Sequence, residues 1–422
     1  MASEKVATCP DPSWFVHDRF GLFIHWGIYA LPARHEWVKH RERITNEGYQ
    51  KYFDHFDPDL YDPHVWAAAA ARAGMKYFVA TTKHHDGFCL WDSQQTEYKA
   101  TRTPAGRDLL APMVEAFRAQ GLRTGFYHSL IDWHHPEFTI DRVHPQRDDQ
   151  EFRAAQAHRD QAKYAAYLRA QVKELLTGYG PVDIMWFDFS YPGEDGKGGP
   201  DWDAENLLRM VRELAPNVIV NNRTTVPQDL WTPEQFQPRE WVRVEDQPVM
   251  WEACQTLNGS WGYHRDNIDW KTPDLLIRML IDSVAKGGNL LLNVGPNGRG
   301  EFQPESLAIL GGIGDWMRLH GRSIYGCGQS QYPAPEDCRL TQNGNRLYLH
   351  LLAWPFGAVH LEGELADRIE YCQFLHDASE LHHELNNHDA LRHDGPQRVA
   401  TIRLPVARPK VAVPVIEIFL KD

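Results

Sequence analysis

Six short apolar segments recur through the first 295 residues, separated by longer stretches of mixed polarity. They are "FGLFIHW" (20–26), "KYFVATT" (76–82), "LRTGFYH" (122–128), "VDIMWFD" (182–188), "NVIVNNR" (217–223) and "NLLLNVG" (289–295). Largely apolar runs of this length are typical of parallel strands that are buried on both faces. The pattern therefore predicts six strands of a parallel sheet.

The stretches between these segments carry helix signals. Each of five begins with Asp, Gly or Thr-Pro, and most end on Gly or Pro: 62–74, 106–121, 149–178, 203–216 and 272–288. Strands that alternate with helices over about 320 residues predict an α/β domain with a parallel sheet, and we expect a (β/α)8-like barrel. An open doubly wound sheet is the alternative.

After residue 326 the alternation stops and shorter strand-like segments follow. They are "NRLYLHLLAW", "IEYCQFL", "RVATIRL" and "PVIEIFL". The Asn-Gly pair in "TQNGN" is a strong signal for a hairpin turn. We therefore expect a barrel over residues 1–326 and a small β-sandwich domain over residues 327–422.

Charge and hydrophobicity narrow the classes of partner. The 422 residues include 44 Lys or Arg and 57 Asp or Glu, for a net charge of -13. This charge opposes binding to nucleic acid or anionic lipid. No apolar run approaches the roughly 18 residues that a membrane span needs. We expect a small neutral ligand, neither nucleic acid nor membrane, and a homo-oligomer stays open.

Targeting and metal signals are weak. The start, "MASEKVATCPDPSWF", lacks the apolar stretch of roughly 7 to 15 residues that marks a secretory signal, so a cytoplasmic location is expected. The six cysteines form no C-x-x-C pair, which is typical of reduced, buried thiols. In "HHELNNH", His383 and His388 are five apart, off the spacing of one helix face, so a surface loop is expected there.

Polar side chains collect where the predicted strands end: His25, His84, His85, His128, Asp188 and Arg223. Loops at the carboxyl ends of barrel strands form the active face of such folds. Asp188 is followed by the Gly- and Pro-rich "FSYPGEDGKGGPDW", which offers no early helix for it to cap. We infer that this carboxylate is functional, as a nucleophile, a general base or a metal ligand.

Several chemistries lack their motifs. The sequence has no G-x-S-x-G, G-x-G-x-x-G, P-loop, H-x-H or H-E-x-x-H pattern, so we expect neither a serine nucleophile nor a bound metal or cofactor. Its 15 tryptophans and 22 histidines supply the flat apolar walls and neutral hydrogen-bonding edges that sugars need. Carbohydrate is the expected ligand.

At these residues the sequence resembles the α-L-fucosidases of glycoside hydrolase family 29. The resemblance rests on motifs in the family's order: "FGLFIHWG", "HEW", "KHHDGFCLWDS", "YHSLIDWHHP", "DIMWFD", "NNR", "TPEQ", "WEACQTLNGSWGY" and "DSVAKGGNLLLNVGPNGRG". It implies a retaining exo-α-L-fucosidase that needs no metal and uses Asp188 as its nucleophile. It also implies sugar contacts from His25, Glu36, Trp37, His84, His85, His128, Trp186, Arg223 and Trp261, with Tyr127 as the alternative to His128.

The acid/base residue is less well defined by the resemblance, because its position varies within the family. Glu234 is the first choice, since "TPEQ" resembles the branch that takes this residue from that loop. Glu252 in "MWEACQ" is the second choice and Glu245 the third. Two other classes stay open: a non-catalytic fucose-binding barrel, and a metal-dependent barrel hydrolase that uses the strand-end histidines and Asp188.

Overall fold

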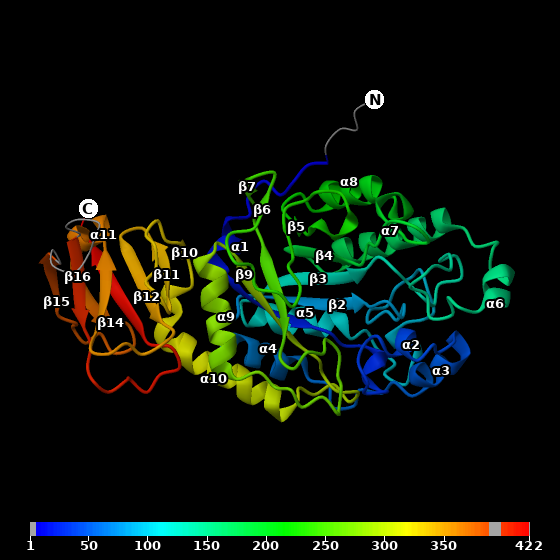
Figure 1. Cartoon of the computed structure of the whole chain (residues 1–422). Coiled ribbons are helices and arrows are strands. Elements are labelled where there is room, and N and C mark those ends of the chain that lie inside the picture. Colours follow the sequence, from blue (N-terminus) through cyan, green and yellow to red (C-terminus); the bar gives the residue numbers. More distant parts are fainter. Residues whose placement is uncertain (1–5, 388–397, 422) are drawn as a thin grey trace.

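The computed structural model describes residues 6–387 and 398–421, and its larger part contains one parallel sheet (Figure 1). The strands are β1 Phe20–Ile24, β2 Tyr77–Lys83, β3 Arg123–Ser129, β4 Ile184–Asp188, β5 Ile219–Val220, β8 Glu252–Thr256 and β9 Asn289–Val294. Their order in the sheet is β5-β4-β3-β2-β1-β9-β8. Each of the six apolar segments therefore contains a strand of the sheet, as predicted.

The sheet curls, and one further segment lies between its two edge strands. Leu230 pairs in parallel with Asn221 beside β5, and Glu234 pairs in parallel with Cys254 of β8. Residues 230–234 thus occupy the place of an eighth strand. The predicted (β/α)8-like architecture is confirmed, and the open doubly wound alternative is wrong.

Strand β8 was not predicted from the sequence. Its residues "EACQT" include few large apolar side chains, so the pattern carries no strand signal. All five residues are nevertheless buried, because this strand turns polar side chains toward the barrel interior. Glu252, the second choice for the acid/base, therefore lies on a strand of the barrel, β8, with no exposed surface.

Helices cover the outer face of the sheet, as the packing of an α/β barrel requires. Five were predicted in position: α4 Pro63–Arg72, α5 Leu110–Ala119, α7 Gln161–Gly178, α8 Ala204–Leu214 and α9 Pro273–Ala285. The predicted helix over 149–178 is two helices, α6 Gln150–Ala155 and α7, because Asp160 caps the second one through the N–H of Ala162. The other helices before residue 327 are α1 Ser13–Asp18, α2 Val38–Arg41, α3 Asn46–Asp54 and α10 Pro304–His320, and α11 Glu364–Arg368 lies in the C-terminal part.

The C-terminal part consists of two antiparallel sheets. One contains β10 Gly328–Gln329, β11 Cys338–Asn343, β12 Arg346–Leu351, β14 Ile369–Phe374 and β17 Val415–Leu420, and the other contains β13 Ala358–Glu362, β15 His383–Asn387 and β16 Arg398–Arg403. The predicted hairpin at Asn343 and Gly344 joins β11 to β12, with Gly344 at φ 57°. Leu349, Leu361 and Ile402 share one core between the sheets, which is the predicted sandwich.

Two expectations for this part have different outcomes. The surface loop expected at "HHELNNH" is wrong for residues 383–387, which form β15 and pair with β16, and His388 lies outside the described residues. The domain boundary after residue 326 stays a prediction, because packing continues across it. Trp316 of α10, for example, donates its indole N–H to the carbonyl of Val413 at 2.9 Å.

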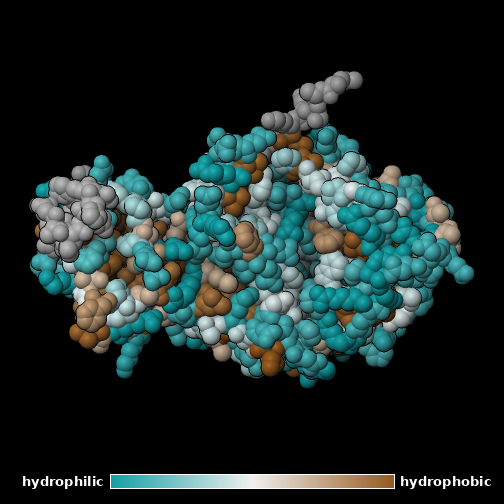
Figure 2. All heavy atoms as spheres, in the orientation of Figure 1, coloured by the Kyte–Doolittle hydropathy of each residue, from teal (hydrophilic) through white to brown (hydrophobic). Residues whose placement is uncertain are grey.

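The face of the molecule drawn in Figure 2 is mainly hydrophilic. On the face shown in Figure 2, hydrophobic atoms lie in small separate patches. No helix in the described part of the chain combines the length and the hydrophobicity that crossing a membrane requires. All six cysteines lie within the described ranges, where each is buried and free.

Candidate active site

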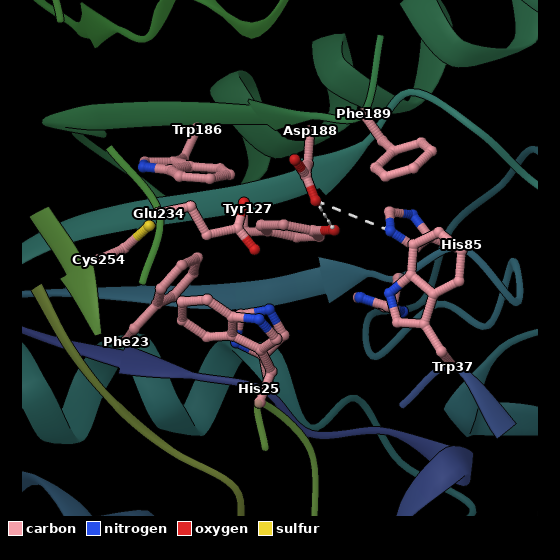
Figure 3. A pocket seen from close by; sticks show the side chains of 12 residues that line it. Phe23, His25, Trp37, His85, Tyr127, Trp186, Asp188, Phe189, Glu234 and Cys254 are labelled. Carbon is pink, nitrogen blue, oxygen red and sulfur yellow. Dashed lines mark hydrogen bonds and ion pairs between the residues drawn. The ribbon is translucent and has the colours of Figure 1, made fainter. Parts of the chain in front are cut away.

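A cavity opens at the carboxyl ends of the barrel strands (Figure 3). Nine predicted site residues line it: His25, Trp37, His84, His85, Tyr127, Trp186, Asp188, Glu234 and Trp261. Three lining residues were not predicted, namely Phe23, Phe189 and Cys254. The other four predicted residues, Glu36, His128, Arg223 and Glu252, lie behind or below its wall.

Side-chain alternation decides which strand residues reach the cavity. On β4, Trp186 and Asp188 are two residues apart and both line it. On β3, Tyr127 lines the cavity, whereas His128 turns to the opposite face and places its Nδ1 atom 2.9 Å from Thr82 Oγ1. The cavity position thus belongs to Tyr127, the alternative, and not to His128.

Asp188 is held by donors on both carboxylate oxygens. Tyr127 donates its hydroxyl to Oδ2 at 2.8 Å, and Arg223 donates Nη1–H to Oδ1 at 2.9 Å. His85 Nε2 lies 3.7 Å from Oδ2. Burial raises the pKa of Asp188 to about 6, and the neighbouring Glu234 adds to this, while Arg223 and Tyr127 act in the opposite direction. The carboxyl group therefore ionises close to neutral pH.

The residue after Asp188 has a strained backbone. Phe189 adopts φ 80°, in the left-handed region, which costs a non-glycine residue about 1 to 2 kcal/mol. This turn ends β4 and places the Phe189 ring against Trp37 and His85, with centroid distances of 5.0 and 5.1 Å. Strain of this kind is concentrated at functional sites. Here it sets an aromatic wall beside the carboxylate.

Arg223 joins Asp188 to a second carboxylate. Its Nη1 atom lies 2.9 Å from Asp188 Oδ1 and 2.9 Å from Glu234 Oε2, so these two oxygens are at most twice 2.9 Å, or 5.8 Å, apart. Thr232 accepts from Nε at 3.0 Å and from Nη2 at 3.1 Å, and the guanidinium lies 4.8 Å from the ring centre of Trp186. Burial acts to lower the pKa of Arg223, but the charges of Asp188 and Glu234 raise it overall, which keeps the guanidinium charged.

Three histidines present neutral rings to the cavity. Burial lowers the pKa of His25 to about 4 and lowers those of His84 and His85 well below their ordinary value. His25 Nδ1 lies 2.7 Å from Asn293 Oδ1, and His85 Nδ1 lies 2.7 Å from Ser129 Oγ. His84 Nδ1 is buried and has no hydrogen-bond partner among the described residues. Neutral imidazoles can donate to or accept from hydroxyl groups of a ligand.

Glu36 supports the cavity from behind. Its carboxylate accepts the N–H of Gly262 at 2.7 Å and lies 3.0 Å from His35 Nδ1. Burial acts to raise the pKa of Glu36, but His35, His25 and the Gly262 N–H outweigh it and lower the pKa. The next residue back from Gly262 is Trp261, whose ring lies 5.2 Å from that of His25. Glu36 therefore anchors the loop that carries Trp261.

The three candidate acids occupy different environments. Glu234 lines the cavity and its side chain is 42% exposed. Glu252 is the first residue of β8, has no exposed surface and accepts a hydrogen bond from the Tyr77 hydroxyl. Glu245 lies on the exposed turn between β6 Arg243–Val244 and β7 Gln247–Pro248. Only Glu234 shares the cavity with Asp188.

The side chains named for the metal-dependent alternative do meet at the cavity, with ring centroids 5.6 Å apart for His25 and His84 and 4.0 Å apart for His84 and His85. Nevertheless, over residues 6–387 and 398–421, no three His, Cys, Asp or Glu side chains are grouped closely enough to hold a metal ion.

The three unpredicted lining residues each had a weak signal in the sequence. Phe23 precedes His25 by two residues, so it shares the face of His25 on one strand. Phe189 directly follows Asp188, and Cys254 lies within the "WEACQ" motif. Alternation alone would have found Phe23, but Cys254 required knowledge that β8 is a strand.

This chain is similar to known proteins over most of its length. A family model described as Alpha-L-fucosidase matches residues 2–322. Human tissue alpha-L-fucosidase is 28% identical over 384 residues, which cover 84% of this chain and 79% of the relative.

Two solved structures are similar over nearly the whole chain. Alpha-L-fucosidase isoenzyme 1 from Paenibacillus thiaminolyticus is 48% identical with a TM-score of 0.91, covering 97% of this chain and 99% of that chain. A GH29 alpha-L-fucosidase from Bacteroides thetaiotaomicron, trapped as a covalent intermediate with 2-fluoro-fucosyl fluoride, is 25% identical with a TM-score of 0.82, covering 100% and 98%.

Proposed function

This chain belongs to the α-L-fucosidase family and is a glycoside hydrolase, and we propose that it removes terminal α-L-fucose from glycans with retention of configuration. One observation carries the proposal. Arg223 holds Asp188 and Glu234 through a single nitrogen, which keeps their facing oxygens within 5.8 Å, twice the 2.9 Å of each contact. Retaining glycosidases place their two carboxyl groups roughly 5 to 5.5 Å apart, whereas inverting enzymes need roughly 6.5 to 9.5 Å.

Asp188 is the nucleophile in this proposal. Its carboxylate attacks the anomeric carbon while the glycosidic C–O bond breaks, and the product is a fucosyl ester of Asp188. Arg223 and Tyr127 favour the ionised form that attack requires, since each donates to one of its oxygens. With a pKa of about 6, most Asp188 carboxylates are charged at neutral pH.

Glu234 serves as acid and then as base. It gives its proton to the leaving oxygen in the first step, and in the second it takes a proton from the water that hydrolyses the ester. Its partial exposure suits this role, because the aglycone departs and water enters from the open side. Since Arg223 contacts both carboxylates, the guanidinium also compensates the charge that shifts between them.

The cavity wall supports recognition of fucose. His25, His84 and His85 offer neutral ring nitrogens to the sugar hydroxyls. Phe23, Trp186 and Trp261 together form an apolar part of the cavity wall. The ring centroid of Phe23 lies 5.2 Å from that of Trp186 and 5.8 Å from that of Trp261. An apolar wall of this kind suits the 5-methyl group that separates fucose from galactose.

The proposal is tested with a panel of aryl glycosides: α-L-fucoside, β-D-galactoside, β-D-glucoside and α-L-rhamnoside, each with and without a chelator. We expect turnover of the fucoside alone, unaffected by chelation, and α-L-fucose as the first product detected by NMR. β-L-Fucose as the first product would overturn retention. Loss of activity on chelation would favour the metal-dependent hydrolase. No turnover of any glycoside, together with fucose binding measured by calorimetry, would favour the non-catalytic fucose-binding protein.

A further inference from the structure

Glu252 lies inside the barrel, at the amino end of β8. It pairs in register with Asn289, the first residue of β9, and its side chain has an exposed fraction of 0%. Cys254, two residues further along the strand, lines the cavity. Because alternate residues share one face of a strand, the carboxyl group of Glu252 lies one layer below the cavity wall.

One donor binds this carboxyl group directly, and a second lies near it. Tyr77, the first residue of β2, donates its hydroxyl to Oε2, and Asn289 Nδ2 lies 3.3 Å from that hydroxyl. The other oxygen, Oε1, and the indole N–H of Trp186 are both buried without a close hydrogen bond in the described part of the chain. Burial raises the pKa of Glu252 to about 8, against the lowering effect of Tyr77 and of the Trp186 N–H.

No positive charge compensates Glu252. Within the described ranges, no Lys, Arg or His nitrogen lies within 4.0 Å of its carboxylate oxygens. Its titratable neighbours are Tyr77 and Cys254, and burial raises the pKa of both well above their ordinary values, so both are neutral. The nearest cation in this network, Arg19, reaches Asn289 Oδ1 at 3.4 Å and does not touch Glu252. An anion here would be costly, because an unpaired buried charge loses its hydration.

Trp186 connects this layer to the reacting groups. Its ring stacks on that of Tyr127 at 5.6 Å, and its centre lies 4.8 Å from the guanidinium of Arg223. Tyr127 and Arg223 are the two residues that bind Asp188. In Figure 3 the nitrogen of the Trp186 indole lies at the end turned away from Asp188, which leaves the N–H to the barrel interior.

We propose that Glu252 is a positioning residue that acts as a neutral carboxylic acid, holding the Trp186 indole and through it the Tyr127 and Arg223 contacts to Asp188. This inference rests on the proposed function, since it assigns Asp188 as the nucleophile. It gives Glu252 a role in the same reaction that is distinct from proton transfer to the substrate. Its ionisation, not only its removal, disturbs the site.

The activity test compares the parent enzyme with Glu252→Gln, Glu252→Ala and the control Glu213→Gln, an exposed carboxylate on α8. The substrate is an aryl α-L-fucoside whose leaving group departs without a proton, so that loss of the Glu234 proton does not limit kcat/KM. We expect parental kcat/KM to fall about tenfold per pH unit above the pKa of about 8, as one ionisation requires. At neutral pH, kcat/KM of Glu252→Gln should stay within about threefold of the parental value, and it should not fall at high pH. Glu252→Ala should lose at least about 30-fold in kcat/KM.

A second measurement does not depend on turnover. The pKa of Glu252 is raised from an ordinary 4.5 to about 8 in the folded protein, so its stabilising contribution is complete below 4.5 and is lost as the pH rises through 8. Glu252→Gln has no such loss. The difference in Tm between Glu252→Gln and the parent should therefore grow between these two pH values, whereas the Glu213→Gln difference stays constant.

The outcomes separate the two proposals. If the parent turns over no fucoside, the proposed function fails, while the Tm comparison still decides the state of Glu252. If Tm of Glu252→Gln and of the parent changed with pH in parallel, Glu252 would not be a neutral acid in the folded protein. A loss of more than about 100-fold in Glu252→Gln at neutral pH would overturn the positioning role and favour proton transfer by Glu252.

Discussion

The carboxyl ends of the barrel strands and the barrel interior each hold a carboxyl group, one half-buried and one fully buried, and the two differ in what surrounds them. Asp188 at the edge has a hydroxyl donor and a guanidinium on its two oxygens, and its pKa is about 6. Glu252 in the interior has only uncharged donors, and its pKa is about 8. Burial is the main cause of the rise in both. The difference teaches that a neighbouring cation offsets burial: Arg223 lowers the pKa of Asp188, and no cation acts in this way on Glu252.

The strongest way to break this comparison is to remove the charged member. Asp188→Asn keeps the shape of the side chain but removes the proposed nucleophile, so kcat/KM for aryl α-L-fucosides should fall by at least about 10⁴-fold. Circular dichroism and Tm should show an intact fold. Activity within about tenfold of the parent would remove Asp188 from the nucleophile's role, since the interior Glu252 cannot replace it.

Replacing Glu234 tests whether the second carboxyl group at the cavity transfers the proton. In Glu234→Ala, fucosides with poor leaving groups should lose about 10³-fold, whereas activated aryl fucosides should lose about tenfold or less in the first step, because their departure needs little protonation. The measurement is kcat/KM across a series of leaving groups. Glu213→Ala, on the surface of α8, is the control. Equal losses on good and poor leaving groups would contradict the assignment.

Replacing Arg223 tests the role of the cation that Asp188 has beside it and Glu252 lacks. Arg223→Met removes the charge that lowers the pKa of Asp188, so this pKa should rise above about 6 by at least about 1 unit. The nucleophile must be ionised, so activity falls as the pH drops through the pKa, and the acid limb of kcat/KM should move to higher pH. At pH values near the parental pKa the loss should be about 100-fold. Arg265→Met, at an exposed pair with Asp266, should leave the limb in place.

Replacing Tyr127 has the smallest expected effect and tests the uncharged donor to Asp188. Tyr127→Phe removes one hydrogen bond to Asp188 and keeps the ring that stacks on Trp186. A hydrogen bond to a charged group is worth about 1.5 to 3 kcal/mol, so a loss of at least roughly 10-fold in kcat/KM is expected, with a smaller shift of the acid limb than in Arg223→Met. A shift larger than that of Arg223→Met would show that the hydroxyl, not the cation, controls Asp188.

Much of the barrel was predictable because its strands are local apolar runs. The six segments contain β1 to β5 and β9, and the strand-end position of Asp188 follows from "VDIMWFD" alone. Strand β8 and residues 230–234 were not predictable in the same way. Their side chains are mixed in polarity, and they pair with the sheet only because the curled edges meet.

The choice between neighbouring residues depended on the direction of side chains. Sequence places Tyr127 and His128 equally near the end of β3, and alternation requires one of them to face outward without saying which one. The sequence also could not decide between Glu234 and Glu252. In the structure Glu234 lines the cavity, whereas Glu252 lies one layer below it, inside the barrel. The backbone path settles each choice.

By itself, the sequence determined the alternation of strands and helices, the carboxylate at the end of β4 and the family, because each is written in contiguous residues. Only the tertiary structure decided the electrostatics of the site. Arg223 reaches Asp188 across 35 residues of chain, and Tyr77 reaches Glu252 across 175. Whether a buried carboxyl group has a cation or only a hydroxyl beside it depends on such distant contacts, and that neighbour sets its charge.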